Sequence, residues 1–317
     1  MYYPYFRGKQ FELITIREMA SLLAENKFIP IIEPVRESLN GLKKTLSAIC
    51  VAGGEAIVIV NPCYGDHQED GTNITELLQK TFAENKSISA GILLRSNMTI
   101  EQVLDFYTQH AEHHPTLIHS GFSAPKVLAS SLETIKARSN IPTNIFIEDH
   151  AKLLYRKHFD KGTRIIVRDG FKRQRNADYP EMEEFSDLHV TFGELGMSGF
   201  GDFLVVGDVY SEGGGPAYAV AIHLTFIDPN KDDVMYIYHF VSDTKDTPTD
   251  PAGKFAQALT KLIAKLDSGT SNILETNAIR EFRELHAKGH FPGLGYVKKL
   301  SMKHHIETLA DYLGRTA

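Results

Sequence analysis

The chain has 317 residues, of which 42% are hydrophobic and 23% charged, and this ordinary composition excludes a disordered, collagen-like or disulfide-scaffold protein. Lys and Arg number 34 and Asp and Glu 40, so the net charge of -6 gives no indication of direct nucleic-acid binding. No apolar run approaches the ~20 residues that span a bilayer, and no charged-then-apolar leader opens the sequence. Its two cysteines, Cys50 and Cys63, lack zinc-ligand spacing, so we expect a protein of the reducing cytoplasm.

Short apolar runs alternate with helical segments along the first two thirds of the chain. The first element, Phe11 to Ala24, carries apolar residues at helical spacing and is expected to form part of a helical cap. Six runs rich in Ile, Val, Leu and Phe then follow at intervals of about thirty residues, as βαβ units require. These runs are Phe28–Ile32, Ala56–Val60, Ile88–Leu94, Thr116–Ile118, Asn144–Ile147 and Thr163–Val167. Nearly continuous apolar runs are typical of parallel strands that are buried on both faces.

The pattern changes after residue 200. A seventh run, Phe203–Val206, leads into the loop Ser211–Pro216, which is too short for a crossover helix. Ala217–Phe226 and Met235–Val241 alternate between two faces around a turn, which predicts an antiparallel strand pair. From Pro251 onward the spacing predicts helices.

These elements predict an α/β fold, a TIM-barrel-like (β/α)8 barrel with the antiparallel pair near its seventh and eighth strands and extra C-terminal helices. No Pro/Gly/Ser-rich linker interrupts the chain, so we expect a single domain. Residues 1–27 would form the N-terminal helical cap, residues 28–250 the barrel and residues 251–317 the C-terminal helices. The alternative is an open doubly wound sheet with an added helical subdomain.

A polar or ionisable residue follows nearly every predicted strand. In chain order these are Glu33, Asn61, Arg95, His119, Glu148 with Asp149, Arg168 and Asp208. Because the carboxyl ends of parallel strands share one edge of the sheet, and barrel enzymes keep their chemistry there, we expect these side chains to converge on a polar pocket. The alternative is a ring of structural ion pairs with no reaction.

The residue types suit two kinds of chemistry. Glu33, His119, Glu148 and Asp208 are the candidate catalytic residues, and Glu33, Glu148, Asp149 and Asp208 are candidate oxygen ligands for a divalent cation such as magnesium. Asn61, Arg95 and Arg168 are candidate ligand-binding residues, because arginine holds anionic groups by paired hydrogen bonds.

A glycine-rich loop follows the seventh run. Its residues Ser211, Glu212, Gly213, Gly214 and Gly215 are candidates for binding an anion through backbone N–H groups. The alternative is a plain connection between strands. On the next strand His223 shares a face with small residues, where it either faces a pocket or belongs to the core.

Four segments of the chain resemble the bacterial beta-protein family. They are Tyr5–Glu18, Ile31–Val35, Gly199–Phe226 and His239–Asp243, and the third is the most specific. The closest resemblance is to a largely uncharacterised subfamily that is often encoded beside a small nuclease-like protein. The family supplies no catalytic residues. What the resemblance implies is a two-gene bacterial module of the kind that acts against phage.

Two functions follow from these observations. The first is a recognition subunit that binds a nuclease-like partner protein and senses a ligand. The second is a metal-assisted hydrolase or transferase that acts on a phosphate-bearing substrate at the carboxyl end of the barrel.

Overall fold

The computed structural model describes residues 1–136 and 142–316. The chain groups into two compact units. The first unit contains Met1–Arg168 and Thr191–Phe203, and the second contains Asp169–Val190 and Leu204–Ala317.

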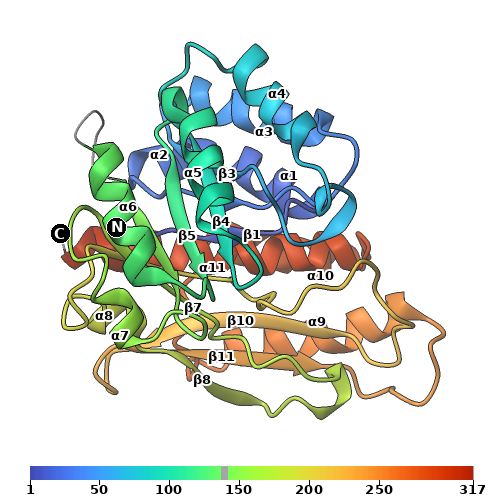
Figure 1. The fold of residues 1–317 in the computed structure, drawn as a ribbon. Helices are drawn as coiled ribbons and strands as arrows, with labels where there is room; N and C mark the ends of the chain where they lie inside the picture. The colour runs from blue at the N-terminus through green and yellow to red at the C-terminus, as the bar shows by residue number, and fades with distance from the viewer. Residues whose placement is uncertain (137–141, 317) are drawn as a thin grey trace. The chain divides into compact units, whose positions relative to one another are not determined.

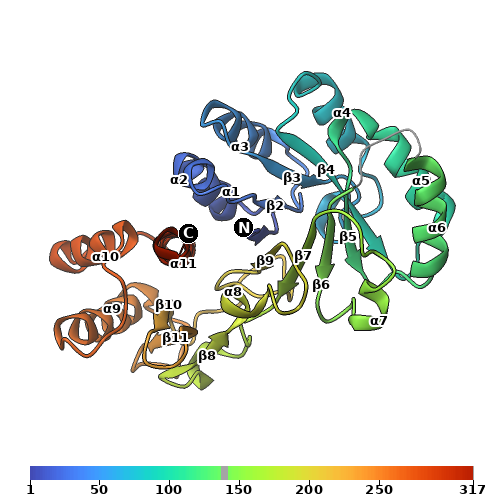
Figure 2. The same cartoon turned by 90° about the vertical axis from the view of Figure 1, so that its left-hand side faces the viewer.

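The first unit is built on a parallel sheet that forms a nearly closed barrel (Figure 2), as the sequence predicts. Its strands, in the order in which they pair, are β1 (Tyr5–Phe6), β2 (Ile31–Ile32), β3 (Ala56–Ile59), β4 (Ile88–Arg95), β5 (Thr116–Ser120), β6 (Asn144–Ile147), β7 (Arg164–Arg168) and β9 (Gly199–Asp202). The barrel closes where the chain before β1 meets β9, since the N–H of Tyr3 donates to the carbonyl of Phe200 at 2.8 Å.

Helices surround the barrel sheet on its outside (Figure 2). They are α1 (Gln10–Glu18), α2 (Ala20–Glu25), α3 (Asn40–Val51), α4 (Thr72–Thr81), α5 (Ile100–Gln109), α6 (Pro125–Lys136) and α7 (Leu153–Arg156), with the 3-10 turns η1 (Gly65–His67) and η2 (Ala111–His113). Most of them connect successive strands, as in βαβ units.

Two barrel strands differ from the prediction. Tyr5–Phe6 forms β1 of the barrel, although it lies in the segment that we expected to be a helical cap. The last strand is Gly199–Asp202, whereas the run Phe203–Val206 forms a turn in which Leu204 has a φ of 51°. Glycine is needed in this strand because a Cβ on Gly201 would lie 2.2 Å from the carbonyl oxygen of Tyr3.

Apolar side chains fill the interior of the barrel. They alternate along the strands with side chains that face the helices. The inward-facing set includes Tyr5, Ile31, Ile59, Leu93, Ile118, Ile145, Ile147, Ile165 and Val167. This alternation decides which residues at the strand ends face the barrel axis.

The second unit contains a three-stranded antiparallel sheet in the order β10–β11–β8 (Figure 1). β10 (Ala221–Asp228) and β11 (Val234–Val241) form the predicted pair, and β8 (Met182–Ser186) adds to the far side of β11. The remaining elements are η3 (Asn176–Asp178), α8 (Leu188–Thr191), α9 (Pro251–Asp267), α10 (Asn277–Lys288) and α11 (Leu294–Thr316).

One face of this sheet packs against helices α9, α10 and α11. Ile222, Leu224 and Phe226 of β10 join Phe255 and Phe282 of the helices in one buried core. His223 and His239 lie on the opposite face. Among the residues that the structure describes, no helix has the length and apolar character needed to cross a membrane.

Candidate functional site

Four polar side chains occupy equivalent inward positions at the carboxyl ends of the first four barrel strands. Each lies two residues beyond a side chain of the barrel interior, so strand alternation turns it toward the barrel axis. We call these four residues the inner rim. They are Arg7 after β1, Glu33 after β2, Asn61 after β3 and Arg95 at the end of β4.

Glu33 is fully buried and has a complete set of partners. Its carboxylate accepts hydrogen bonds from the hydroxyl of Tyr5 at 2.8 Å, from the N–H of Cys63 at 2.8 Å, and from Arg7 in a close ion pair. The thiol of Cys63 also donates to it at 3.3 Å. These donors stabilise the ionised carboxylate, as a buried charge requires.

Aromatic rings enclose the guanidinium group of Arg7. Its central carbon lies 4.9 Å from the ring centres of both Tyr5 and Tyr64, and 5.3 Å from that of Phe203. Rings at this distance attract a cation through their faces. Arg7 and Glu33 together therefore form a buried pair without net charge.

The side chain of Asn61 forms hydrogen bonds with the backbone of the sheet. Its side-chain amide donates to the carbonyl of Leu93 at 2.9 Å, and its oxygen accepts from the N–H of Leu93 at 2.8 Å. This pair of bonds extends the β3–β4 pairing beyond the end of β3. Both hydrogen-bonding groups of this side chain are thus occupied.

Arg95 differs from the other inner-rim residues because no ion pair within the described part of the chain neutralises its charge. Its Nε–H is buried and has no hydrogen-bond partner among the described residues. Arg95 acts electrostatically on Cys63, whose pKa is raised to about 12, first by burial and then by Glu33. The thiol is therefore neutral near pH 7 and leaves the positive charge of Arg95 uncompensated.

His119 faces the helices, one residue out of phase with Ile118, and does not reach the inner rim. Its Nδ1 bonds the hydroxyl of Tyr155 at 2.8 Å, its Nε2 bonds the amide oxygen of Asn144 at 3.0 Å, and its ring stacks on Phe146. Burial lowers its pKa to about 3, so the ring is neutral. This strand register corrects the expectation that His119 lies beside Glu33.

Glu148 and Arg168 also belong to the outer side of the barrel. Arg168 donates to Glu148 through Nε at 2.5 Å and Nη2 at 3.2 Å. Arg156 is buried beside this pair, and its pKa is lowered by burial and raised in part by Glu148. Asp149 is exposed and pairs with Lys152 at 3.5 Å. The predicted carboxylates Glu33, Glu148 and Asp149 therefore do not gather at one point.

The remaining candidates lie in the second unit. The N–H of Asp208 donates to Asp169 at 2.8 Å, and Ser211 accepts from Arg173 at 3.2 Å. Glu212 and the glycines Gly213, Gly214 and Gly215 are exposed. A Cβ on any of these three glycines would meet no atom within 4 Å, so no close approach of the backbone requires glycine there.

The predicted metal ligands are not brought together. In residues 1–136 and 142–316 no three His, Cys, Asp or Glu side chains form a group that could hold a metal ion. Glu33 and Glu148 instead accept from arginine side chains.

Arg7 and Cys63 belong to the site although they were not predicted from the sequence. Arg7 follows a two-residue strand that was expected to belong to the helical cap, and Cys63 lies beyond the end of β3. Side chains of a strand alternate between its two faces, so the second residue after an inward-facing side chain also faces inward. This rule could have identified Arg7 from the sequence.

Comparisons with protein-family models, with curated proteins and with solved structures find no match.

Proposed function

We propose that this chain is a recognition protein that binds an anionic ligand at the inner rim of its barrel. The observation that carries the proposal is the guanidinium group of Arg95, whose buried Nε–H has no partner among the described residues while the neighbouring carboxylate of Glu33 is already fully bonded. A buried donor on a cation is costly when it is left unpaired, and a phosphate or carboxylate group would satisfy it.

The position of Arg95 supports the same proposal. Ligands of parallel barrels bind at the carboxyl ends of the strands, and Arg95 lies at that end of β4 on the inward face. The neighbours of Arg95 add no unpaired negative charge, since Cys63 is neutral and Glu33 is paired with Arg7. A phosphate-bearing or carboxylate-bearing ligand matches this local charge.

Titration calorimetry with defined anions tests this proposal. Inorganic phosphate and pyrophosphate form one arm, and succinate and citrate form the other, so that the two sources of negative charge are distinguished. Arg95→Gln is expected to weaken binding by about tenfold or more, because a hydrogen bond to a charged group contributes roughly 1.5–3 kcal/mol. Arg95→Lys keeps the charge but loses the fork of donors, so an intermediate loss is expected.

Arg175→Gln is the matched control. Arg175 is 88% exposed and pairs with Asp178, so its replacement removes one positive charge from an exposed side chain. The proposal fails if none of the four anions binds at millimolar concentration, or if the Arg95 and Arg175 variants lose affinity equally.

We further propose that the chain is cytoplasmic and acts with a small nuclease-like partner protein in a two-gene bacterial module directed against phage. The partner and the module rest on the resemblance of Gly199–Phe226 and the other three segments to the beta-protein family. The free thiols of Cys50 and Cys63 fit a reducing compartment. Co-expression with the product of the neighbouring gene, followed by affinity purification, tests the partnership, and failure of the two proteins to co-purify would contradict it.

A further inference from the structure

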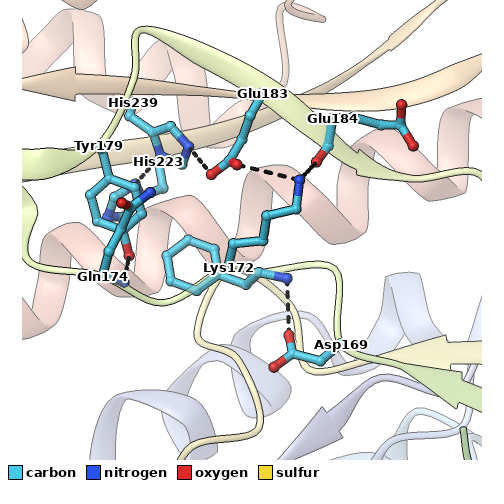
Figure 3. Close-up of polar contacts among 9 residues, drawn as sticks. Asp169, Lys172, Gln174, Tyr179, Glu183, Glu184, His223 and His239 are labelled. Carbon is cyan, nitrogen blue, oxygen red and sulfur yellow. Dashed lines mark hydrogen bonds and ion pairs between the residues drawn. The ribbon is translucent and has the colours of Figure 1, made fainter. Parts of the chain in front are cut away.

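Three titratable side chains form a hydrogen-bonded chain on the second unit's sheet, on the face away from helices α9 and α10 (Figure 3). Nδ1 of His223 lies 2.7 Å from Nδ1 of His239, and Nε2 of His239 lies 3.2 Å from Oε1 of Glu183. The two histidines are directly paired across β10 and β11, and Glu183 lies on the adjoining strand β8. The pairing of β10 with β11 and of β11 with β8 thus places the three groups in this order.

The partners determine where the protons lie. A carboxylate only accepts, so Nε2 of His239 carries a hydrogen and donates it to Glu183. Neutral His239 then has a bare Nδ1, and the short contact requires the hydrogen to be on Nδ1 of His223. Nε2 of His223 is left with a lone pair.

Nε2 of His223 forms no hydrogen bond with a described residue, and His223 is partly exposed to solvent. Aromatic rings flank the imidazole. The ring of Tyr179 lies 4.8 Å from it and that of Phe171 lies 5.1 Å from it, both edge-on.

Charged groups from several elements surround the hydrogen-bonded chain of His223, His239 and Glu183. Lys172 lies 3.4 Å from Oε2 of Glu183 and also donates to the carbonyl of Glu184 (Figure 3), while Lys298 of α11 acts on His223 at longer range. Burial lowers the pKa of both histidines, and Glu183 partly raises that of His239. The pair is therefore neutral near pH 7, which is the state in which His223 can accept a proton.

We propose that Glu183, His239 and His223 form a proton relay in which His223 is a general base for the hydrolysis of carboxylic esters with an aromatic group. His223 touches the reacting water, and His239 and Glu183 are positioning residues. The rings of Tyr179 and Phe171 would contact the aromatic group of the ester.

The proposed step balances without a cofactor. Water loses a proton to Nε2 of His223 as its oxygen forms a bond to the ester carbonyl carbon. The Nδ1 hydrogen of His223 moves toward His239, whose Nε2 hydrogen moves toward Glu183. The carbon–oxygen bond to the leaving alcohol or phenol then breaks, and the leaving oxygen takes up the proton when the relay returns to its first state.

Hydrolysis of p-nitrophenyl acetate by the full chain tests the relay. The rate of p-nitrophenol release is measured from about pH 3 to pH 9, because burial lowers the pKa of His223 well below 6.5 and the midpoint of the pH profile reports the base. His223→Gln is expected to lower the rate by about tenfold or more. Glu183→Gln is expected to lower the rate severalfold and to move the midpoint to lower pH, because the positively charged form of the relay loses its counter-ion. His286→Gln, which removes an exposed histidine of α10, is expected to leave the rate unchanged.

A measurement on the unmodified protein covers the case in which His223→Gln does not fold. Diethyl pyrocarbonate transfers its ethoxycarbonyl group to Nε2 of an accessible neutral histidine, and peptide mapping by mass spectrometry locates the product. Loss of hydrolysis is expected to follow modification of His223. Activity that survives this modification, a folded His223→Gln variant with the original rate, or a Glu183→Gln variant with an unchanged rate and midpoint would overturn the proposal.

Discussion

Arg7 and Glu33 form a buried ion pair between the first two strands of the barrel. Both side chains are almost completely buried, with side-chain exposures of 7% and 0%. Tyr5 and Cys63 donate additional hydrogen bonds to the same carboxylate. The pair therefore joins β1 to β2 and the chain beyond β3 through one charged group.

Removing one partner of this pair is expected to be costly. In the Arg7→Met variant the carboxylate of Glu33 stays buried without its counter-ion, and the free energy of unfolding should fall by about 3–5 kcal/mol. The double variant Arg7→Met/Glu33→Gln should lose less than the sum of the two single changes, since no uncompensated charge remains. Urea denaturation followed by circular dichroism measures both effects.

The exposed pair of Lys80 and Glu76 is the control. Their side chains are 71% and 51% exposed, so Lys80→Met should cost less than about 1 kcal/mol. Equal losses for Arg7→Met and Lys80→Met would show that burial of the Arg7–Glu33 pair has no energetic consequence.

Glu148 is expected to stabilise the barrel as a shared counter-ion and not as a metal ligand. It accepts two hydrogen bonds from Arg168 and lies in the field of Arg156, which is buried. Glu148→Gln should lower the free energy of unfolding by about 1.5–3 kcal/mol, because the guanidinium groups then repel one another. Glu133→Gln, at the exposed pair with Lys161, should change it by less than about 1 kcal/mol. Urea denaturation of both variants measures the difference, and the idea is wrong if they are equally stable.

The sequence predicted that polar residues end the strands, but not whether each side chain faces the barrel axis or the surrounding helices. Glu33 and Arg95 face the barrel axis, whereas His119 and Arg168 are displaced by one residue and face outward, since each directly follows an inward side chain. A shift of one residue reverses the face of a strand, and the exact strand ends depend on tertiary pairing. The ion pairs themselves follow from contacts between strands that are distant in sequence.

Fold prediction succeeded where strands have long apolar runs and failed where they do not. The run Ile88–Leu94 and the alternation in Met235–Val241 both correspond to strands, β4 and β11. Tyr5–Phe6 has only two residues, which is too short for a recognisable strand pattern, and Gly199–Asp202 has two glycines and an aspartate, which are depleted in strands. Barrel closure imposes strand geometry on both.

Acid is expected to destabilise the second unit through His304. This buried histidine donates from Nε2 to the carbonyl of Thr225 at 2.8 Å and accepts from the hydroxyl of Thr276 at 2.9 Å. Burial lowers its pKa from 6.5 to about 4, so the unfolded chain binds its proton at a higher pH than the folded chain does. Its stabilising contribution is therefore complete above about pH 6.5 and is lost as the pH falls toward 4.

The His304→Gln variant isolates this effect. The difference in unfolding free energy between the original protein and the variant should shrink by about 3 kcal/mol between pH 6.5 and pH 4, because each unit of pKa shift corresponds to about 1.4 kcal/mol. Urea denaturation at a series of pH values measures it. A difference that is constant with pH would mean that His304 has the same pKa in the folded and unfolded chains.

Gly201 and Gly214 differ in how closely other atoms approach them. A Cβ on Gly201 would lie 2.2 Å from the carbonyl oxygen of Tyr3, at the point where the barrel closes. Gly201→Ala should therefore push β9 away from the N-terminal segment and lower the free energy of unfolding by about 3 kcal/mol or more. A Cβ on Gly214 would meet no atom within 4 Å, and the φ of Gly214 is not positive, so Gly214→Ala should be neutral or stabilising by up to about 1 kcal/mol. Thermal and urea unfolding of the two variants measure the contrast, and similar stability of the two would show that close approach at Gly201 is not needed for closure.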